Sequence, residues 1–203
     1  TISNHPYGGV DGIMLIDLIG HLRSEFKVIV NEFLSQIECL HPSMIFVNPK
    51  IDENSVITPT NLQGIREIMR HIRDGYPLGI FPSGAVSDLH PLERRICDRE
   101  WQPSVLKIIH RAKVPIVPIR FFDRNSLFFY LLGLISWKIR VLRLPTEIVN
   151  KAGSVHRIGI GKTISVEEQS LYRDQKSFGK FLRDAVYGMP LPETFRSRKE
   201  IIR

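Results

Sequence analysis

Hydrophobic residues along this chain follow two alternating spacings, one helical and one extended. Apolar residues at helical spacing predict helices with a buried face over residues 11–22, 58–74 and 105–112. Short runs rich in β-branched and aromatic residues predict strands over residues 26–30, 44–47, 78–81 and 114–119. Asn31 is placed to cap a further helix after the first strand. This alternation predicts an α/β fold in a single domain, with a mixed, mostly parallel sheet flanked by helices.

One later segment, Leu127–Ile135, is apolar almost all round. As a helix it would be only about 14 Å long at 1.5 Å per residue, which is too short to span a bilayer. Burial in the core and contact with a membrane interface or an acyl chain are both open interpretations. The basic residues Lys138, Arg140 and Arg143 follow the segment and could meet lipid headgroups.

The charge balance indicates which class of partner the protein could bind. The chain has 203 residues, a formal net charge of +7 and a pI of about 9.6. Such a surface favours an anionic partner: a membrane, an acidic carrier protein, a phosphorylated substrate or nucleic acid. We expect no nucleic acid, because the sequence has no helix-turn-helix spacing, zinc ligands or stacking aromatic motif. The two cysteines are far apart in sequence, so they predict neither a metal motif nor a disulfide framework, and a reducing compartment is expected.

Domain organisation is expected to be simple. We assign residues 1–190 to one domain and residues 191–203 to a basic C-terminal tail. The chain begins with Thr, almost at its first motif, so we expect that it lacks an upstream segment and that a membrane anchor could be part of that segment.

The candidate chemistry begins at Asn4–Gly12, where five residues separate His5 from Asp11. Pro6, Gly8 and Gly9 in this segment disfavour a continuous helix, so the loop could fold the carboxylate back towards the imidazole. A histidine oriented by a carboxylate is the minimal device for taking a proton from a hydroxyl. Taken alone, the pair also fits a surface turn with two polar residues.

Three further segments follow this motif in order: Phe81–Ser87, Val114–Ile119 and Arg124–Ser126. With them, residues 3–164 resemble the glycerolipid acyltransferase superfamily, and most of all its bacterial branch related to the acyltransferases of ornithine and glycine lipids. The resemblance implies that His5 is a general base oriented by Asp11. The acceptor, a lipid hydroxyl, would then attack the thioester of acyl-CoA or of an acyl-carrier protein, with no metal and no bound cofactor. It also implies peripheral contact with the cytoplasmic face of the inner membrane.

The chain departs from the family pattern at two places. Five residues instead of four separate His5 from Asp11, and the extra residue falls in the flexible Gly-Gly loop. In the pattern Phe-Pro-Glu-Gly-Thr-Arg-Ser, Ser83 replaces the Glu and Val86 replaces the Arg. These two family residues help position a phosphorylated acceptor, so another acceptor becomes more plausible, for example the hydroxyl of an acylated amino acid. Alternatively, Arg94, Arg95 or Arg99 supplies the missing charge.

Several other residues are candidate substrate contacts. Gly84 would allow a tight turn and close approach of substrate, and Ser83 offers a polar contact without the G-x-S-x-G pattern of a nucleophile. Asn4 is expected to hold the loop by hydrogen bonding. A cluster of arginines could bind an anion or form an ordinary solvated face; its members are Arg94, Arg95 and Arg99.

A second function class fits the same sequence. A basic domain on this scaffold could bind a lipid or a protein without catalysis, and the altered Phe81–Ser87 segment is the main feature in favour of it. The two classes differ in whether His5 acts on a substrate.

Overall fold

The computed structural model describes residues 1–32, 35, 38–47 and 59–202. Its strands are β1 Ile2–Ser3, β2 Lys27–Asn31, β3 Met44–Val47, β4 Leu78–Gly79, β5 Asp88–His90, β6 Arg95–Cys97, β7 Pro118–Phe121 and β8 Ile158–Ile160. Within the described part of the chain, they form two three-stranded sheets, β3-β2-β4 and β1-β7-β8, and the separate hairpin β5-β6. All the pairings in the two sheets are parallel except that of β7 with β8.

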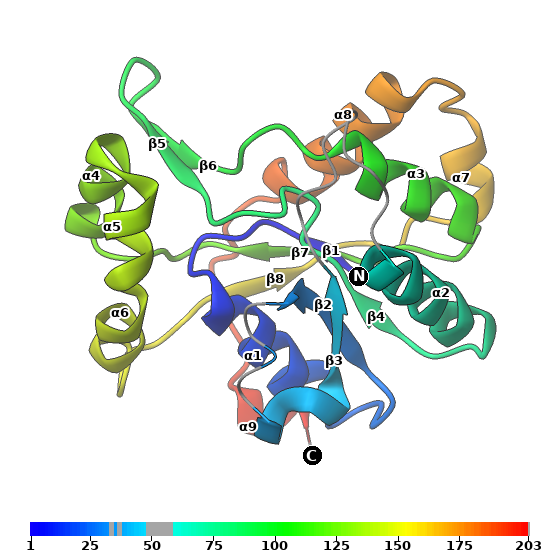
Figure 1. The fold of residues 1–203 in the computed structure, drawn as a ribbon, viewed down its shortest axis with the longest axis horizontal. Helices are drawn as coiled ribbons and strands as arrows, with labels where there is room; N and C mark the ends of the chain where they lie inside the picture. The colour runs from blue at the N-terminus through cyan, green and yellow to red at the C-terminus, as the bar shows by residue number, and fades with distance from the viewer. Residues whose placement is uncertain (33–34, 36–37, 48–58, 203) are drawn as a thin grey trace.

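The two sheets meet at the N-terminal strand. The Ser3 N–H donates to the carbonyl of Ile80, and the Ile80 N–H donates to that of Thr1, at 3.1 and 3.0 Å. Ile2 and Ile80 form a parallel bridge at this point. The strands therefore run as one twisted surface in the order β3-β2-β4-β1-β7-β8 (Figure 1). The predicted α/β fold with a mixed, mostly parallel sheet is confirmed.

Helices cover both faces of this surface. They are α1 Gly9–Ile19, the 3₁₀ helix η2 Glu38–Ser43, α2 Pro59–Arg73, α3 Pro103–Ala112, α4 Leu127–Ile135, α5 Trp137–Leu142, α6 Leu144–Asn150, α7 Val166–Ser170, α8 Gln175–Tyr187 and α9 Arg198–Ile201. In Figure 1, α1 lies below the strands, whereas α3 and α8 lie above them. Leu15 of α1 packs in a cluster with Val28, Phe81 and Ile119. A second cluster joins the strands to α2, α3 and α8.

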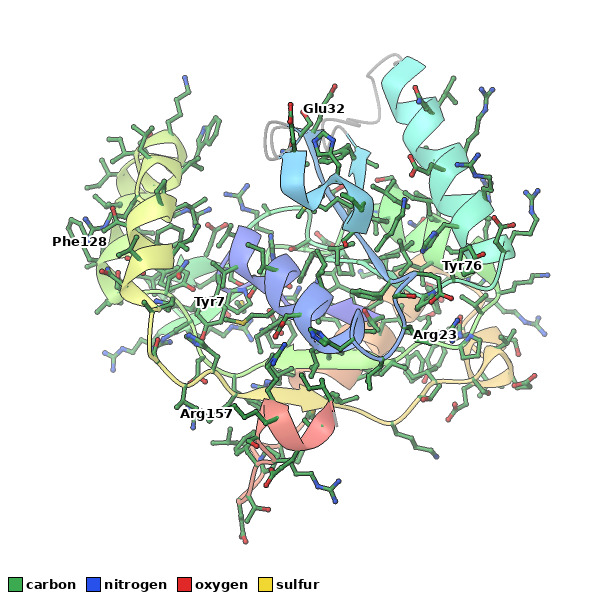
Figure 2. All side chains as sticks on the ribbon, turned by 90° about the horizontal axis from the view of Figure 1, so that it is seen from below. Tyr7, Arg23, Glu32, Tyr76, Phe128 and Arg157 are labelled. Carbon is green, nitrogen blue, oxygen red and sulfur yellow. The ribbon has the colours of Figure 1, made fainter. Side chains whose placement is uncertain are left out.

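The helices α4, α5 and α6 stack at one end of the molecule, beside the β5-β6 hairpin (Figure 1). We call α4–α6, residues 127–150, the lobe. In Figure 2, Phe128 in the lobe lies at one side of the molecule, and Tyr76 and Arg23 lie towards the other. Among the described residues, no helix has the length and apolar character needed to cross a membrane.

Several predicted boundaries were wrong. The helix α1 starts at Gly9 and ends at Ile19 instead of reaching Leu22, which is exposed. The last predicted strand begins only at Pro118, because Pro115 lacks the N–H that a strand interior needs, whereas proline is tolerated at the first position of a strand. Asn31 ends β2, and the helix predicted after it falls mostly outside the described residues, as does Thr58 before α2.

The part of the chain after residue 87 was predicted least completely. The hydrophobic patterns did not indicate the β5-β6 hairpin, β8 or α8, although α8 supplies Phe178, Leu182 and Val186 to the core. In the basic tail, α9 forms and Arg198 pairs with Asp17.

The contribution of α8 to stability can be measured at Leu182, which is fully buried. Leu182→Ala should lower the free energy of unfolding by about 3 kcal/mol, because it removes buried apolar surface and leaves a cavity. Urea denaturation measures this change. Leu171→Ala is the matched control, since Leu171 is exposed, and it should change the free energy by less than about 0.5 kcal/mol. Equal effects of the two substitutions would contradict the assignment of α8 to the core.

Candidate active site

The predicted His5–Asp11 pair is assembled where β1 passes into α1. Asp11 lies in the first turn of α1, and its Oδ2 accepts hydrogen bonds from the N–H groups of Tyr7 and Gly8 at 2.9 and 3.0 Å. The same oxygen lies 2.8 Å from Nδ1 of His5. The Asp11 side chain is fully buried, whereas that of His5 is 17% exposed. Five intervening residues therefore bring the two groups together, because the Gly-rich loop turns back on itself.

Burial determines the electrostatics of the pair. It raises the pKa of the Asp11 carboxyl above its ordinary value, and the neighbouring His5 and the two N–H groups oppose that rise. Because the carboxylate is fully buried, it depends on these three groups in place of solvent. The arrangement therefore fixes the orientation of the imidazole ring.

The His5 backbone is held by a second acidic residue, Asp98, which follows β6. Asp98 Oδ1 accepts the His5 N–H at 3.0 Å and the Ser87 hydroxyl at 2.6 Å. Its Oδ2 accepts the indole N–H of Trp101 at 3.2 Å. The Ser87 N–H in turn donates to the His5 carbonyl at 2.9 Å. Asp98 thus fixes the position of His5 from the side of the backbone, while Asp11 fixes the ring.

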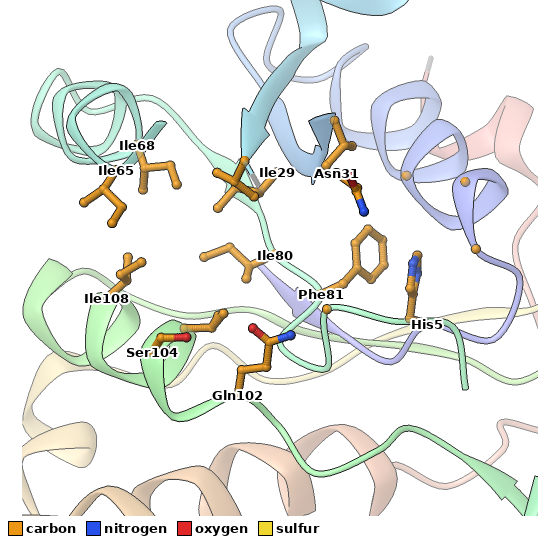
Figure 3. Close-up of a pocket in the computed structure, with 17 residues that line it drawn as sticks. His5, Ile29, Asn31, Ile65, Ile68, Ile80, Phe81, Gln102, Ser104 and Ile108 are labelled. Carbon is orange, nitrogen blue, oxygen red and sulfur yellow. The ribbon is translucent and has the colours of Figure 1, made fainter. Parts of the chain in front are cut away.

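The His5 ring lies at the end of a cavity of about 160 Å³ (Figure 3). The ring packs against Phe81, with centroids 4.2 Å apart. The other end of the cavity is apolar, and its walls come from β2, β3, α2, α3 and the strand segment at residue 80: Ile29, Val47, Ile65, Ile68, Ile80 and Ile108. A proton acceptor therefore lies next to a space that suits a hydrocarbon chain.

Asn4, Ser83 and Gly84 all lie near this site but differ in what they contact. The Asn4 amide exchanges two hydrogen bonds with the Phe121 backbone, at 2.9 and 2.8 Å. The Ser83 hydroxyl donates to the Ala85 carbonyl within its own turn. Gly84 lines the cavity and has a φ of +63°. An added Cβ there would lie 2.0 Å from Nε2 of Gln102, so the end of that flexible side chain would have to shift. The positive φ is therefore what favours glycine at this position.

The three arginine candidates lie on or just after the β5-β6 hairpin. Arg95 pairs with Glu93, and Arg99 pairs with Asp88. Arg94 occupies the hairpin turn with a φ of +48°. Within the described part of the chain, the arginines do not line the cavity that holds His5.

The sequence analysis did not predict the residues that hold His5 and its loop in place or complete the cavity. Asp98 was visible only as part of a charged stretch, and its spacing of three residues from Trp101 was the available signal. Gln102 lines the cavity and donates to the Ser83 carbonyl at 3.2 Å. Tyr130 in α4 donates to the Pro6 carbonyl at 2.7 Å, so it supports the His5 loop from a distant segment. No local pattern could indicate a partner 124 residues away.

The fold and site define an α/β domain with a histidine–carboxylate pair beside an apolar cavity. A family model described as Acyltransferase matches residues 1–190. The chain therefore belongs to this acyltransferase family, and its resemblance to the glycerolipid acyltransferases is confirmed. It is an acyltransferase by class.

Two curated relatives are named Lyso-glycine lipid O-acyltransferase. The protein from Phocaeicola vulgatus is 28% identical over 193 residues, which cover 92% of this chain and 66% of the relative. The protein from Bacteroides thetaiotaomicron is 27% identical over 201 residues, which cover 92% of this chain and 68% of the relative. The chain thus spans about two thirds of the length of these relatives.

The role of Asp98 as a clamp can be tested by stability. Asp98→Asn should lower the free energy of unfolding by about 1–3 kcal/mol, because an amide nitrogen would face a buried donor in place of an accepting oxygen. Urea denaturation measures this value. Asp184→Asn serves as the control, since Asp184 forms only an exposed pair with Lys180 and should change stability by less than about 0.5 kcal/mol. An equally small effect at position 98 would rule out the clamp.

Proposed function

We propose that this domain transfers a fatty acyl group from an acyl thioester to the hydroxyl of a lysolipid, with His5 as the general base. The observation that carries the proposal is the pairing of His5 with buried Asp11 beside the apolar cavity. The cavity offers a place for hydrocarbon, and the pair offers a proton acceptor at its end.

The proposed reaction follows from the geometry of the pair. Nδ1 of His5 faces Asp11, so Nε2 is the nitrogen left to accept the proton of the hydroxyl. The hydroxyl oxygen bonds to the thioester carbon, and the carbon–sulfur bond then breaks. His5 returns the proton to the departing sulfur, so no proton is gained or lost by the enzyme. Gly8 and Gly9 at the N-terminus of α1 border the same cavity, where a helix dipole favours the negative charge of the tetrahedral intermediate.

The donor in this proposal is acyl-CoA or an acyl-carrier protein. Both are anionic, in keeping with the net charge of +7. A thioester is already activated, so a positioned base and charge stabilisation suffice, and the reaction needs no metal and no bound cofactor.

The proposed acceptor is the hydroxyl of an acylated amino acid, as in the lyso-glycine lipids named for the two relatives. Two features support it. Ser83 and Val86 replace the Glu and Arg that serve a phosphorylated acceptor in the family pattern. Arg95 and Arg99, which could have supplied the missing charge, are paired with carboxylates. The non-catalytic binding domain is the second candidate, and the same altered segment favours it.

His5→Gln should lower the rate of acyl transfer by about 10²–10⁴-fold, because the variant lacks a base at the hydroxyl. The assay mixes purified protein with a lyso-glycine lipid and either acyl-CoA or acyl-carrier protein, and follows the acylated product by mass spectrometry. His21→Gln is the matched control, since His21 is exposed and lies beyond α1, and it should keep full activity. Undiminished turnover in His5→Gln would contradict the role of His5 as the general base. Absence of thioester consumption by the unsubstituted domain would favour the binding domain.

The cavity should also set acyl-chain length. Ile65→Phe places a larger side chain in the cavity wall formed by α2, so it should shift the ratio of kcat/KM towards shorter acyl donors by about tenfold or more. A competition assay with donors of two lengths measures this ratio. Leu62→Phe is the control because Leu62 is exposed on the same helix. An unchanged ratio in Ile65→Phe would place the acyl chain elsewhere.

A further inference from the structure

The lobe exposes an unusually apolar surface. We define the outer face of the lobe by six exposed side chains: Leu127, Phe128, Leu134, Ile135, Trp137 and Leu142. Ile135 and Leu142 are 77% and 79% exposed, and Trp137 is 61% exposed. Large apolar side chains grouped in this way on a soluble surface mark an interaction site.

The inner face of the lobe is the polar one. Arg140 is buried, where it donates to the Ser87 carbonyl at 3.2 Å and pairs with Asp88. Glu147 is also buried, and its carboxylate accepts the N–H and the hydroxyl of Ser126 at 2.9 and 2.6 Å. These two charged groups thus point towards the protein, whereas the six side chains of the outer face are exposed. Because Arg140 and Glu147 already bind the rest of the protein on the inner side, turning the helices to bury the outer face would break these contacts.

The exposed charged residues around the outer face are basic. Glu147 is the only acidic residue in the sequence from Arg124 to Val155, and it is buried. Three basic residues flank the face and are at least partly exposed: Arg124, Lys138 and Arg143. Lys151 instead pairs with Glu147 on the inner side. Lys138 and Arg143 lie over the rings of Trp137 and Phe128, at 6.0 and 5.4 Å from the centroids. Such pairs of an aromatic ring with a cation suit the boundary between hydrocarbon and headgroups.

We propose that the outer face of the lobe docks on a bilayer that contains anionic lipid. The apolar side chains would enter the acyl boundary, while the basic residues contact the headgroups. A second copy of the chain fits this face less well. In a twofold dimer, the same patch meets itself, so its cations would lie opposite one another, and residues 124–155 offer no exposed carboxylate to compensate them.

The lobe also links this surface to the His5 loop. The Tyr130 hydroxyl donates to the Pro6 carbonyl at 2.7 Å, and the Asn125 amide donates to the Tyr7 carbonyl at 3.2 Å. Docking of the lobe would therefore bring the candidate site close to the lipid surface. The inference goes beyond the proposed function and does not require it, because docking can occur without catalysis.

The test is vesicle flotation with the purified 203-residue chain. The probes are phosphatidylcholine vesicles with and without phosphatidylglycerol. Unsubstituted protein should float with the anionic vesicles. The double variant Ile135→Glu/Leu142→Glu should bind them at least about tenfold more weakly, because it puts charge where apolar surface must enter the boundary. Lys138→Gln should weaken binding to anionic vesicles about fivefold and leave any binding to pure phosphatidylcholine unchanged.

The matched control carries the same charges elsewhere. Leu22→Glu/Leu171→Glu changes two exposed leucines, one beyond α1 and one at the end of α7, and it should float like unsubstituted protein. Circular dichroism should show that both double variants are folded. His5→Gln should also float normally, so undiminished acyl transfer by this variant with intact flotation would count against the proposed function alone. Equal flotation of the two double variants would overturn the docking proposal. An outer-face variant that changes only self-association, measured by sedimentation velocity, would overturn it in favour of a dimer.

Discussion

The site depends on the place that β1 takes in the sheet. This strand of two residues lies between β4 and β7, and its backbone is hydrogen-bonded on both sides. The chain leaves it through Asn4, whose amide continues the pairing with the Phe121 backbone. His5 therefore starts from the best-anchored part of the fold, at the carboxyl end of a parallel strand, where α/β folds place their ligands. A loop that begins elsewhere would not hold a ring with this accuracy.

Buried charge is the second constraint on the site. Asp11 and Asp98 are both buried, and each accepts several hydrogen bonds: two from N–H groups for Asp11, and one each from an N–H, a hydroxyl and an indole for Asp98. Such groups are costly to bury unless they are hydrogen-bonded, so their partners can occupy only a small set of positions. The fold therefore holds two carboxylates in fixed positions. Asp11 contacts the ring of His5, and Asp98 contacts its backbone.

Buried, hydrogen-bonded charges also determine which side of the lobe is apolar. Arg140 and Glu147 use the inner contacts, so the apolar side chains of α4–α6 are left on the outside. Of the two interpretations left open for Leu127–Ile135, full burial holds for Phe129 and Tyr130, while Phe128, Leu131 and both ends of the helix are exposed. One piece of structure thus supports the His5 loop on its inner side and presents a surface for a partner on its outer side.

The sequence by itself determined the fold class and the pair His5 and Asp11, because both depend on short-range features: hydrophobic spacing, and a loop whose glycines and proline allow a reversal. It also contained the departure at Ser83 and Val86 that bears on the acceptor. Only the tertiary structure decided the role of Asp98, the shape of the cavity, the pairing of Arg95 and Arg99, and which side of the lobe faces out. Each of these depends on contacts between residues far apart in the chain, and such contacts leave no periodic signal in the local sequence.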